Sequence, residues 1–184
     1  MIVIGASLGG LRALRVLLSG LPKNFSSPMA VVLHRAKDTP DLLASVLQPY
    51  TSLRVVEAMD KDPIEPGCIY LAPPDYHLLV DRDCFSLSVD APVNYARPSI
   101  DVLFQSAADI LRKKAVAVLL TGSSCDGAAG AAAIAACGGT VAVQDPRSAE
   151  NPIMPASALE RISTAKILPL GDIASFLVET LATL

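Results

Sequence analysis

The chain has 184 residues, of which 52% are hydrophobic, and 15 basic and 18 acidic side chains give it a formal net charge of −3. This length suits one domain with a full core, and the lack of Trp, with four Phe and four Tyr, predicts an aliphatic core typical of buried parallel strands. No basic stretch favours nucleic-acid binding, and no apolar run approaches the roughly 20 residues of a membrane span, so we expect a protein that is not membrane-embedded.

Apolar runs alternate with helical patterns along the whole chain. Strands are predicted, in order, over residues 2–5, 29–33, 53–56, 68–72, 115–120, 140–143 and 166–168. Helices are predicted from the first glycine turn to about 19, then over 39–47, from the N-cap Ser99 to 111, and over 128–136, 155–161 and 172–184. This alternation predicts an α/β fold, a doubly wound, mostly parallel sheet with helices on both faces. Residues 77–80 and 85–89 are expected to form one antiparallel hairpin.

Two finer predictions concern the core-facing side of the helix that begins at Ser99 and the chemical state of the cysteines. The core-facing side chains of this helix are expected to be Val102, Leu103, Ala107, Ile110 and Leu111. The four cysteines, Cys68, Cys84, Cys125 and Cys137, are scattered without a CxxC pair. They are expected to be free thiols of a cytoplasmic protein, not a disulfide frame or a zinc site.

A glycine-rich turn follows the first predicted strand, over residues 5–10, and Ser7 lies on it. The turn holds the serine hydroxyl beside the free N–H groups and positive end of the next helix, which suits a nucleophile whose attack creates an oxyanion. Two other interpretations stay open: the glycines bind a phosphate, as in dinucleotide-binding turns, or Ser7 is simply an N-cap.

Three polar residues follow predicted strands whose C-terminal ends share one edge of a parallel sheet, where ligands bind. They are Ser7, His34 and Asp126. In such a set the imidazole takes the hydroxyl proton and the carboxylate orients the ring. Each has a structural alternative: His34 as an ordinary strand-end residue, and Asp126 as the N-cap of the alanine-rich helix. The residues 5–9 also fit a G-x-S-x-G elbow, but the order Ser, His, Asp and the position on the first strand exclude the α/β-hydrolase family.

Further segments carry a family resemblance from residue 2 to the final helix. They are the turn at 5–10, His34 after an apolar strand, and residues 69–78, 97–104, 120–122, 126–128, 130, 144–146 and 154–155. With these markers the chain resembles the catalytic domain of the bacterial chemotaxis protein-glutamate methylesterases (CheB-type).

The resemblance implies a serine hydrolase that removes methyl esters from glutamate side chains of chemoreceptor signalling helices, with a possible deamidating activity on receptor glutamines. It implies Ser7 as nucleophile, His34 as general base and acid, and Asp126 as orienting carboxylate. Leu8 and Gly9 are candidate oxyanion donors, and Ser123 lies in the same vicinity. Water is the second reactant, no metal or cofactor is expected, and residues 1–184 are expected to be one catalytic domain without a receiver domain.

The chain departs from the family pattern beside each of these residues. Leu8 stands where threonine is usual, Arg35 and Ala36 where Met-Pro is usual, and Ser123 and Ser124 where methionine and glycine are usual. An alternative hypothesis follows, a catalytically impaired module of the same fold that only binds a receptor or signalling protein. A nucleotide-binding domain is a weaker alternative, because no acidic residue follows the turn at about 20 positions. Cys125 is a poor nucleophile candidate, because nothing basic nearby in the sequence would lower its pKa, and His77 is expected to be structural.

Overall fold

A seven-stranded parallel sheet forms the centre of the molecule in the computed structural model, which describes residues 1–37 and 42–182. Its strand order is β3-β4-β2-β1-β7-β8-β9, and every neighbouring pair is parallel. The strands are β1 (Ile2–Ala6), β2 (Met29–Leu33), β3 (Arg54–Glu57), β4 (Cys68–Leu71), β7 (Val116–Leu119), β8 (Thr140–Gln144) and β9 (Lys166–Leu168). The predicted doubly wound α/β class is therefore confirmed.

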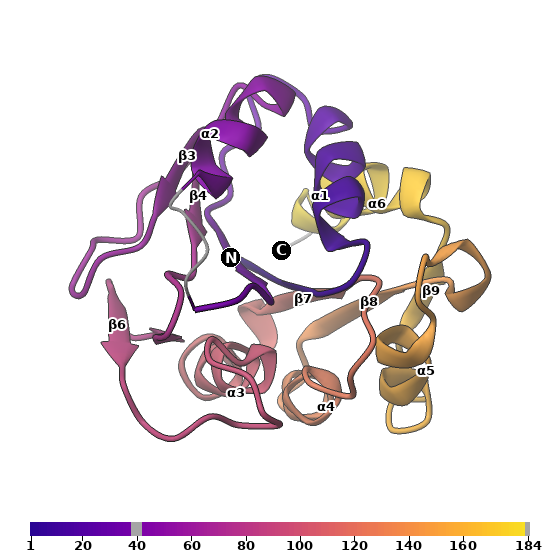
Figure 1. Cartoon of the computed structure of the whole chain (residues 1–184). Helices are drawn as coiled ribbons and strands as arrows, with labels where there is room; N and C mark the ends of the chain where they lie inside the picture. Colours follow the sequence, from indigo (N-terminus) through magenta and orange to yellow (C-terminus); the bar gives the residue numbers. More distant parts are fainter. Residues whose placement is uncertain (38–41, 183–184) are drawn as a thin grey trace.

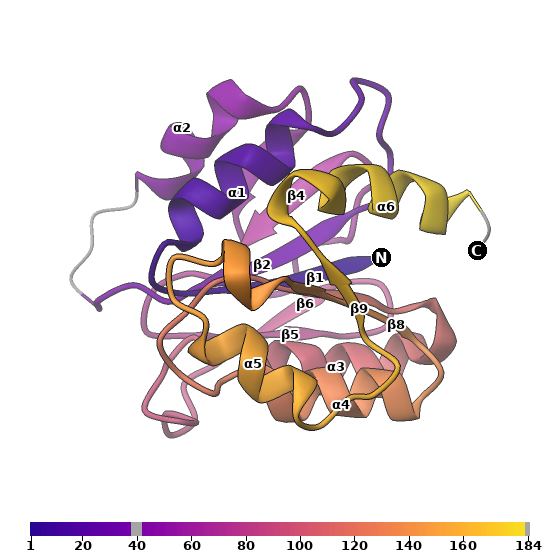
Figure 2. The same cartoon turned by 90° about the vertical axis from the view of Figure 1, so that its right-hand side faces the viewer.

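Helices cover both faces of this sheet (Figures 1 and 2). On one face lie α1 (Gly10–Ser19), α2 (Leu43–Leu47) and α6 (Ile173–Leu181), and on the other α3 (Ile100–Leu111), α4 (Ala128–Ala136) and α5 (Ile153–Leu159). The hairpin of β5 (His77–Val80) and β6 (Phe85–Ser88) is antiparallel and belongs to the α3 side. Short 3₁₀ turns, η1 to η4, occupy Gln48–Tyr50, Arg112–Lys114, Pro146–Ser148 and Leu170–Asp172.

The central strand β1 shows why the sheet is buried on both sides. Ile2 and Ile4 pack into the cluster under α1 and α6, whereas Val3 packs into the cluster under α3 and α4, and all three have no exposed surface. Successive side chains of a strand point to opposite faces. A strand covered on both faces therefore reads as a continuous apolar run, which is why β1 and β7 were predictable.

Some predicted boundaries differ from the structure. The fifth helix begins at Ile153, two residues before the predicted start. On α3, Ile110 is 39% exposed and Val102 is only partly buried and outside both core clusters, whereas both were expected to face the core. The inward face of α3 also includes Ile100, Phe104 and Ala108. The predicted helix start at 39–41 and the last two residues of the predicted closing helix lie outside the described residues. Within residues 1–37 and 42–182, no helix is both long enough and apolar enough to span a membrane.

Candidate active site

The ends of three adjacent strands bring the predicted residues together. Strands β1 and β2 pair in register up to Ala6 and Leu33, and the next N–H, that of His34, donates to Ala6 O at 3.0 Å. On the other side, Ser7 N donates to Thr121 O, just after β7, at 3.0 Å. The ladder bonds thus continue one residue beyond the strands and fix Ser7 between the ends of β2 and β7.

A surface cavity of about 630 Å³ opens at this edge, and we call it the serine cavity. Its walls include Ser7, Leu8, Gly9, His34 and Ser123. Five of the six residues predicted to form the site therefore line one cavity, and the sixth, Asp126, lies behind His34 with no exposed surface.

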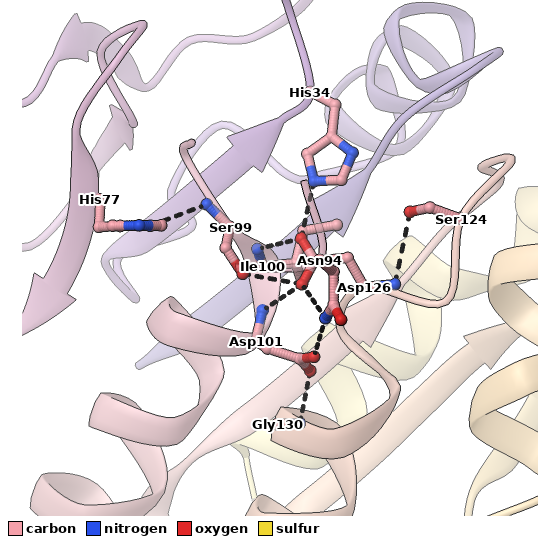
Figure 3. A network of polar contacts seen from close by, with 9 residues as sticks. All are labelled: His34, His77, Asn94, Ser99, Ile100, Asp101, Ser124, Asp126 and Gly130. Carbon is pink, nitrogen blue, oxygen red and sulfur yellow. Dashed lines mark hydrogen bonds and ion pairs between the residues drawn. The ribbon is translucent and has the colours of Figure 1, made fainter. Parts of the chain in front are cut away.

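The His34 ring and the Asp126 carboxylate are directly bonded, with 2.7 Å between His34 Nε2 and Asp126 Oδ2 (Figure 3). The carboxylate accepts, so His34 Nε2 carries a proton in this contact and Nδ1 is the remaining ring nitrogen. The His34 side chain is 16% exposed. The ring is therefore bonded to a buried carboxylate and lines the same cavity as Ser7, although no hydrogen bond joins it to the Ser7 hydroxyl among the described residues.

Four other donors surround the Asp126 carboxylate. Its Oδ2 also accepts from Ile100 N at 2.7 Å, and its Oδ1 accepts from Ser99 Oγ at 2.8 Å, Asp101 N at 3.1 Å and Asn94 Nδ2 at 3.3 Å. Burial raises the pKa of Asp126, but the hydrogen bonds from His34 and from the start of α3 outweigh burial, so its pKa lies below the ordinary value. The charged, oriented form of this carboxylate is the stable one.

Asp126 accepts from the start of a helix, but not of the alanine-rich helix that its structural alternative named. It accepts the first two N–H groups of α3, Ile100 and Asp101, whereas α4 begins after Gly127 with no side-chain cap. In return, Asp101 on α3 accepts from Gly130 N in the first turn of α4 at 2.7 Å. The first turn of α3 thus donates to Asp126, in the loop before α4, and the first turn of α4 donates to Asp101 of α3, an arrangement we call the crossed caps. Burial, with the nearby Asp126, raises the pKa of Asp101.

Ser99 and His77 extend this network (Figure 3). Ser99 is the N-cap residue of α3, as predicted, but its hydroxyl makes no cap bond and donates to Asp126 instead, because Asp126 already accepts the helix N–H groups. His77 is 1% exposed; its Nδ1 accepts from Ser99 N and its Nε2 donates to Ala91 O, both at 3.2 Å. His77 is therefore a neutral structural residue that holds Ser99 in place, in agreement with the sequence-based expectation.

The N-terminus of α1 borders Ser7. Its N-cap is Gly9 with φ 78°, a conformation that favours glycine, so Ser7 is not the N-cap. Gly10 N donates to Ser7 O at 2.8 Å and is occupied. The N–H groups of Leu8 and Gly9 donate no hydrogen bond to any described residue, which leaves them free for a ligand oxygen in the serine cavity.

Asn94 and Asp101 are contributors to the site that the sequence patterns did not single out. Asn94 donates through one amide nitrogen to Asp101 Oδ2 at 2.8 Å and to Asp126 Oδ1. Its only signal was its place in an irregular segment close to residues 97–104, which carried the family resemblance. Among the described residues, no three His, Cys, Asp or Glu side chains gather as metal ligands would.

The fold and this edge define a class: doubly wound α/β proteins whose polar cluster stands at the C-terminal ends of central parallel strands. Residues 2–177 match the family model described as CheB methylesterase, and the chain belongs to this family.

Among proteins of known sequence, the chain is 40% identical over 178 residues to a putative protein-glutamate methylesterase/protein-glutamine glutaminase of Leptospira interrogans, covering 96% of this chain and 92% of that protein. It is 36% identical over 182 residues to the protein-glutamate methylesterase/protein-glutamine glutaminase of Thermotoga maritima, covering 97% of this chain but 53% of that protein. The crystal structure of the Thermotoga maritima CheB methylesterase catalytic domain superposes with a TM-score of 0.91 at 36% identity and covers 97% of both chains.

Proposed function

We propose that this chain is a serine esterase that hydrolyses glutamate γ-methyl esters of chemoreceptor proteins and also deamidates receptor glutamines, with Ser7, His34 and Asp126 as its catalytic triad. The observation that carries the proposal is the 2.7 Å bond between His34 and the buried Asp126 carboxylate, on a ring that shares the serine cavity with Ser7. The names of the relatives from Leptospira interrogans and Thermotoga maritima support the substrate class.

The proposed reaction is acyl transfer in two steps. Ser7 Oγ attacks the ester carbonyl carbon while His34 Nδ1 takes the hydroxyl proton, and Asp126 stabilises the imidazolium. The carbonyl oxygen becomes an oxyanion that the N–H groups of Leu8 and Gly9 bind. The C–O bond to the methoxy group breaks, and methanol leaves with the proton from His34. Water then attacks the glutamyl-enzyme, His34 takes its proton, and the free carboxylate leaves as Ser7 is regenerated.

The test is labelling with a fluorophosphonate probe, followed by mass spectrometry of the modified peptide, together with methanol release from a methylated receptor. We expect label on Ser7 and none on Ser123, and we expect Ser7→Ala to abolish both label and methanol release. Ser157→Ala is the matched control, because this exposed hydroxyl on α5 bonds only Ile153 O in its own helix. Activity that survives Ser7→Ala would disprove the assignment of the nucleophile.

The alternative, a binding module without activity, is not favoured, because the relatives that match almost the whole chain are named as enzymes. It makes a separable prediction: receptor binding with no reaction at Ser7 at any probe concentration.

A further inference from the structure

The turn formed by Asn94 and Tyr95 has an uncommon backbone. Val93 N donates to Ala96 O at 3.1 Å and Ala96 N donates to Val93 O at 2.9 Å, so only Asn94 and Tyr95 lie between the paired residues. The φ angles of Asn94 and Tyr95 are 50° and 62°. Two left-handed residues at the centre of such a turn favour Asn followed by Gly. Asn94 matches this preference, whereas a bulky aromatic residue such as Tyr95 is strained in this conformation.

The Tyr95 side chain does not contribute to the packing of the fold. It is fully exposed, and it makes no hydrogen bond, ion pair or ring contact with another described residue. A single exposed aromatic side chain is ordinary on a protein surface. An exposed aromatic side chain on a strained backbone is not, because such strain persists only where the surrounding structure imposes it and is concentrated at sites that bind ligands.

The neighbouring Asn94 ties this turn to the proposed triad. Asn94 Nδ2 donates to Asp101 Oδ2 at 2.8 Å and to Asp126 Oδ1 at 3.3 Å (Figure 3). The same Asp126 carboxylate is bonded to the His34 ring. The backbone that carries the Tyr95 ring is therefore held in a fixed place relative to the His34 imidazole before any ligand arrives.

Tyr95 lines a second cavity, of about 470 Å³, which His34 lines as well. Half of its wall is apolar, and these residues are Ala36, Pro92, Tyr95, Ala96 and Pro98. Ala36 and Pro92 are exposed, as Tyr95 is. The part of this wall that a ligand can reach is therefore largely apolar.

The charged side chains in the wall of the second cavity are already paired. Lys37 and Arg97 both pair with Asp75, and Arg35 pairs with Glu57. The hydrogen bonds from Lys37 and Arg97 lower the pKa of Asp75, so this carboxylate stays charged. A charged ligand would have to compete with these pairs, whereas an apolar group needs only the exposed apolar part of the wall. The second cavity therefore favours an apolar ligand group.

We propose that Tyr95 is a specificity-determining residue whose ring packs against an apolar side chain of the protein segment that carries the reacting ester. This inference rests on the proposed function, because it takes the segment bound at Ser7 to extend past His34 into the second cavity. The ligand class is a peptide segment with a large aliphatic side chain close to the ester. Covering the exposed ring removes apolar surface from water, and tyrosine is among the side chains that contribute most to protein interfaces.

The experiment uses two synthetic peptides, each with one glutamate methyl ester, that differ only in having one leucine or one glutamine on each side of the ester. The constants kcat and KM are measured by methanol release, and binding is measured by fluorescence anisotropy with the Ser7→Ala protein, with and without Tyr95→Asn. We expect the wild-type chain to prefer the leucine peptide at least about fivefold in kcat/KM, because the ring and the leucine bury apolar surface together. The difference is expected in KM more than in kcat, since this contact does not involve the reacting atoms.

Tyr95→Asn removes the ring and introduces a residue that tolerates left-handed backbone. We expect its preference for the leucine peptide to fall below about twofold, because the apolar contact is lost. The urea midpoint of unfolding is expected to stay the same or to rise, since the strain is relieved. Tyr95→Phe keeps the ring and should restore the preference. Ile167→Thr is the matched control, because Ile167 is another exposed apolar side chain, on β9 and outside both cavities.

Equal handling of the two peptides by the wild-type chain would overturn the inference, and so would a full preference in Tyr95→Asn. A clear fall in the urea midpoint of Tyr95→Asn would also overturn it, because the ring would then serve the fold. Failure of the proposed function looks different: Ser7 would not be labelled by the fluorophosphonate probe, while anisotropy would still report whether the leucine peptide binds more tightly and whether Tyr95 causes it.

Discussion

Replacing Asp126 by asparagine tests the site and the fold at once. All five groups around the carboxylate donate hydrogen bonds to it, two to Oδ2 and three to Oδ1. An asparagine amide has one acceptor oxygen and one NH₂ group, so whichever way it lies, the NH₂ faces donors. With the NH₂ on the Oδ2 side, His34 can change tautomer and accept, but Ile100 N–H loses its partner. With the NH₂ on the Oδ1 side, the Asp101 N–H loses its partner.

One buried backbone N–H left unpaired costs about 1–3 kcal/mol, so Asp126→Asn is expected to lower the free energy of unfolding by about 2 kcal/mol at pH 7. With His34 in the wrong tautomer, ester hydrolysis is expected to fall by about 10⁴-fold, as in other triads that lose this carboxylate. Urea unfolding and methanol release measure the two effects. Asp109→Asn, a change of an exposed carboxylate on α3 that accepts from Gln105, is the control, with an expected change within about 0.5 kcal/mol.

The pH dependence of this difference has a definite sign. Because the folded-state pKa of Asp126 is lowered, its stabilisation is fully present above the unfolded value of about 3.9 and is lost as pH falls through the folded pKa. The raised pKa of Asp101 acts in the opposite direction, but its largest cause, burial, is the same in both proteins. The gap between wild type and Asp126→Asn should therefore narrow in acid. A variant as stable as wild type at pH 7, or a gap that widens on acidification, would refute the described hydrogen-bond network.

The remaining predictions concern the supports of the site. Gly130→Ala places a Cβ 2.5 Å from Phe104 Cβ and 2.9 Å from Asp101 O, where α3 and α4 meet, so we expect a loss of about 1–3 kcal/mol in urea unfolding; unchanged stability would mean that the helices can move apart. His77→Leu leaves Ser99 N and Ala91 O without partners and should cost about 2 kcal/mol, while Ser7 remains reactive to the probe at a reduced rate. Ser7→Ala should change the free energy of unfolding by less than about 0.5 kcal/mol, because no side-chain hydrogen bond joins its hydroxyl to another described residue; a large loss would indicate a structural role.

The strands were predictable because burial on both faces leaves few alternatives to a short β-branched run. β1 and β2 end within one residue of their predicted limits, and so does β9, although this edge strand is largely exposed. α4 lies at its predicted bounds, where Gly138 and Gly139 interrupt the alanine run. That Ser7 and His34 lie at one edge of the sheet followed from their places after two predicted parallel strands. That these strands, β1 and β2, are neighbours came from the structure.

The partners of Asp126 were not predictable in the same way. Local sequence favours a cap for the helix that follows an aspartate in the chain, yet Asp126 accepts from Ile100, 26 positions earlier. The choice depends on how closely α3 and α4 pack, which Gly130 permits and no local pattern encodes. The pairing of Arg35 with Glu57 was not predictable from local sequence either, because it joins the end of β2 to β3, a strand at the sheet edge.

The crossed caps couple the folding of the α3 and α4 starts to the orientation of His34. The first turns of α3 and α4 gain their carboxylate partners only when the two helices pack together, so the carboxylate that orients His34 is held in place only once these two helix starts have met. A protein in which the starts of α3 and α4 have separated would keep much of the sheet but would no longer orient the His34 imidazole. Turnover would then be switched off by a local opening far smaller than global unfolding, and the rate of reaction would report on that opening before any spectroscopic change in the sheet.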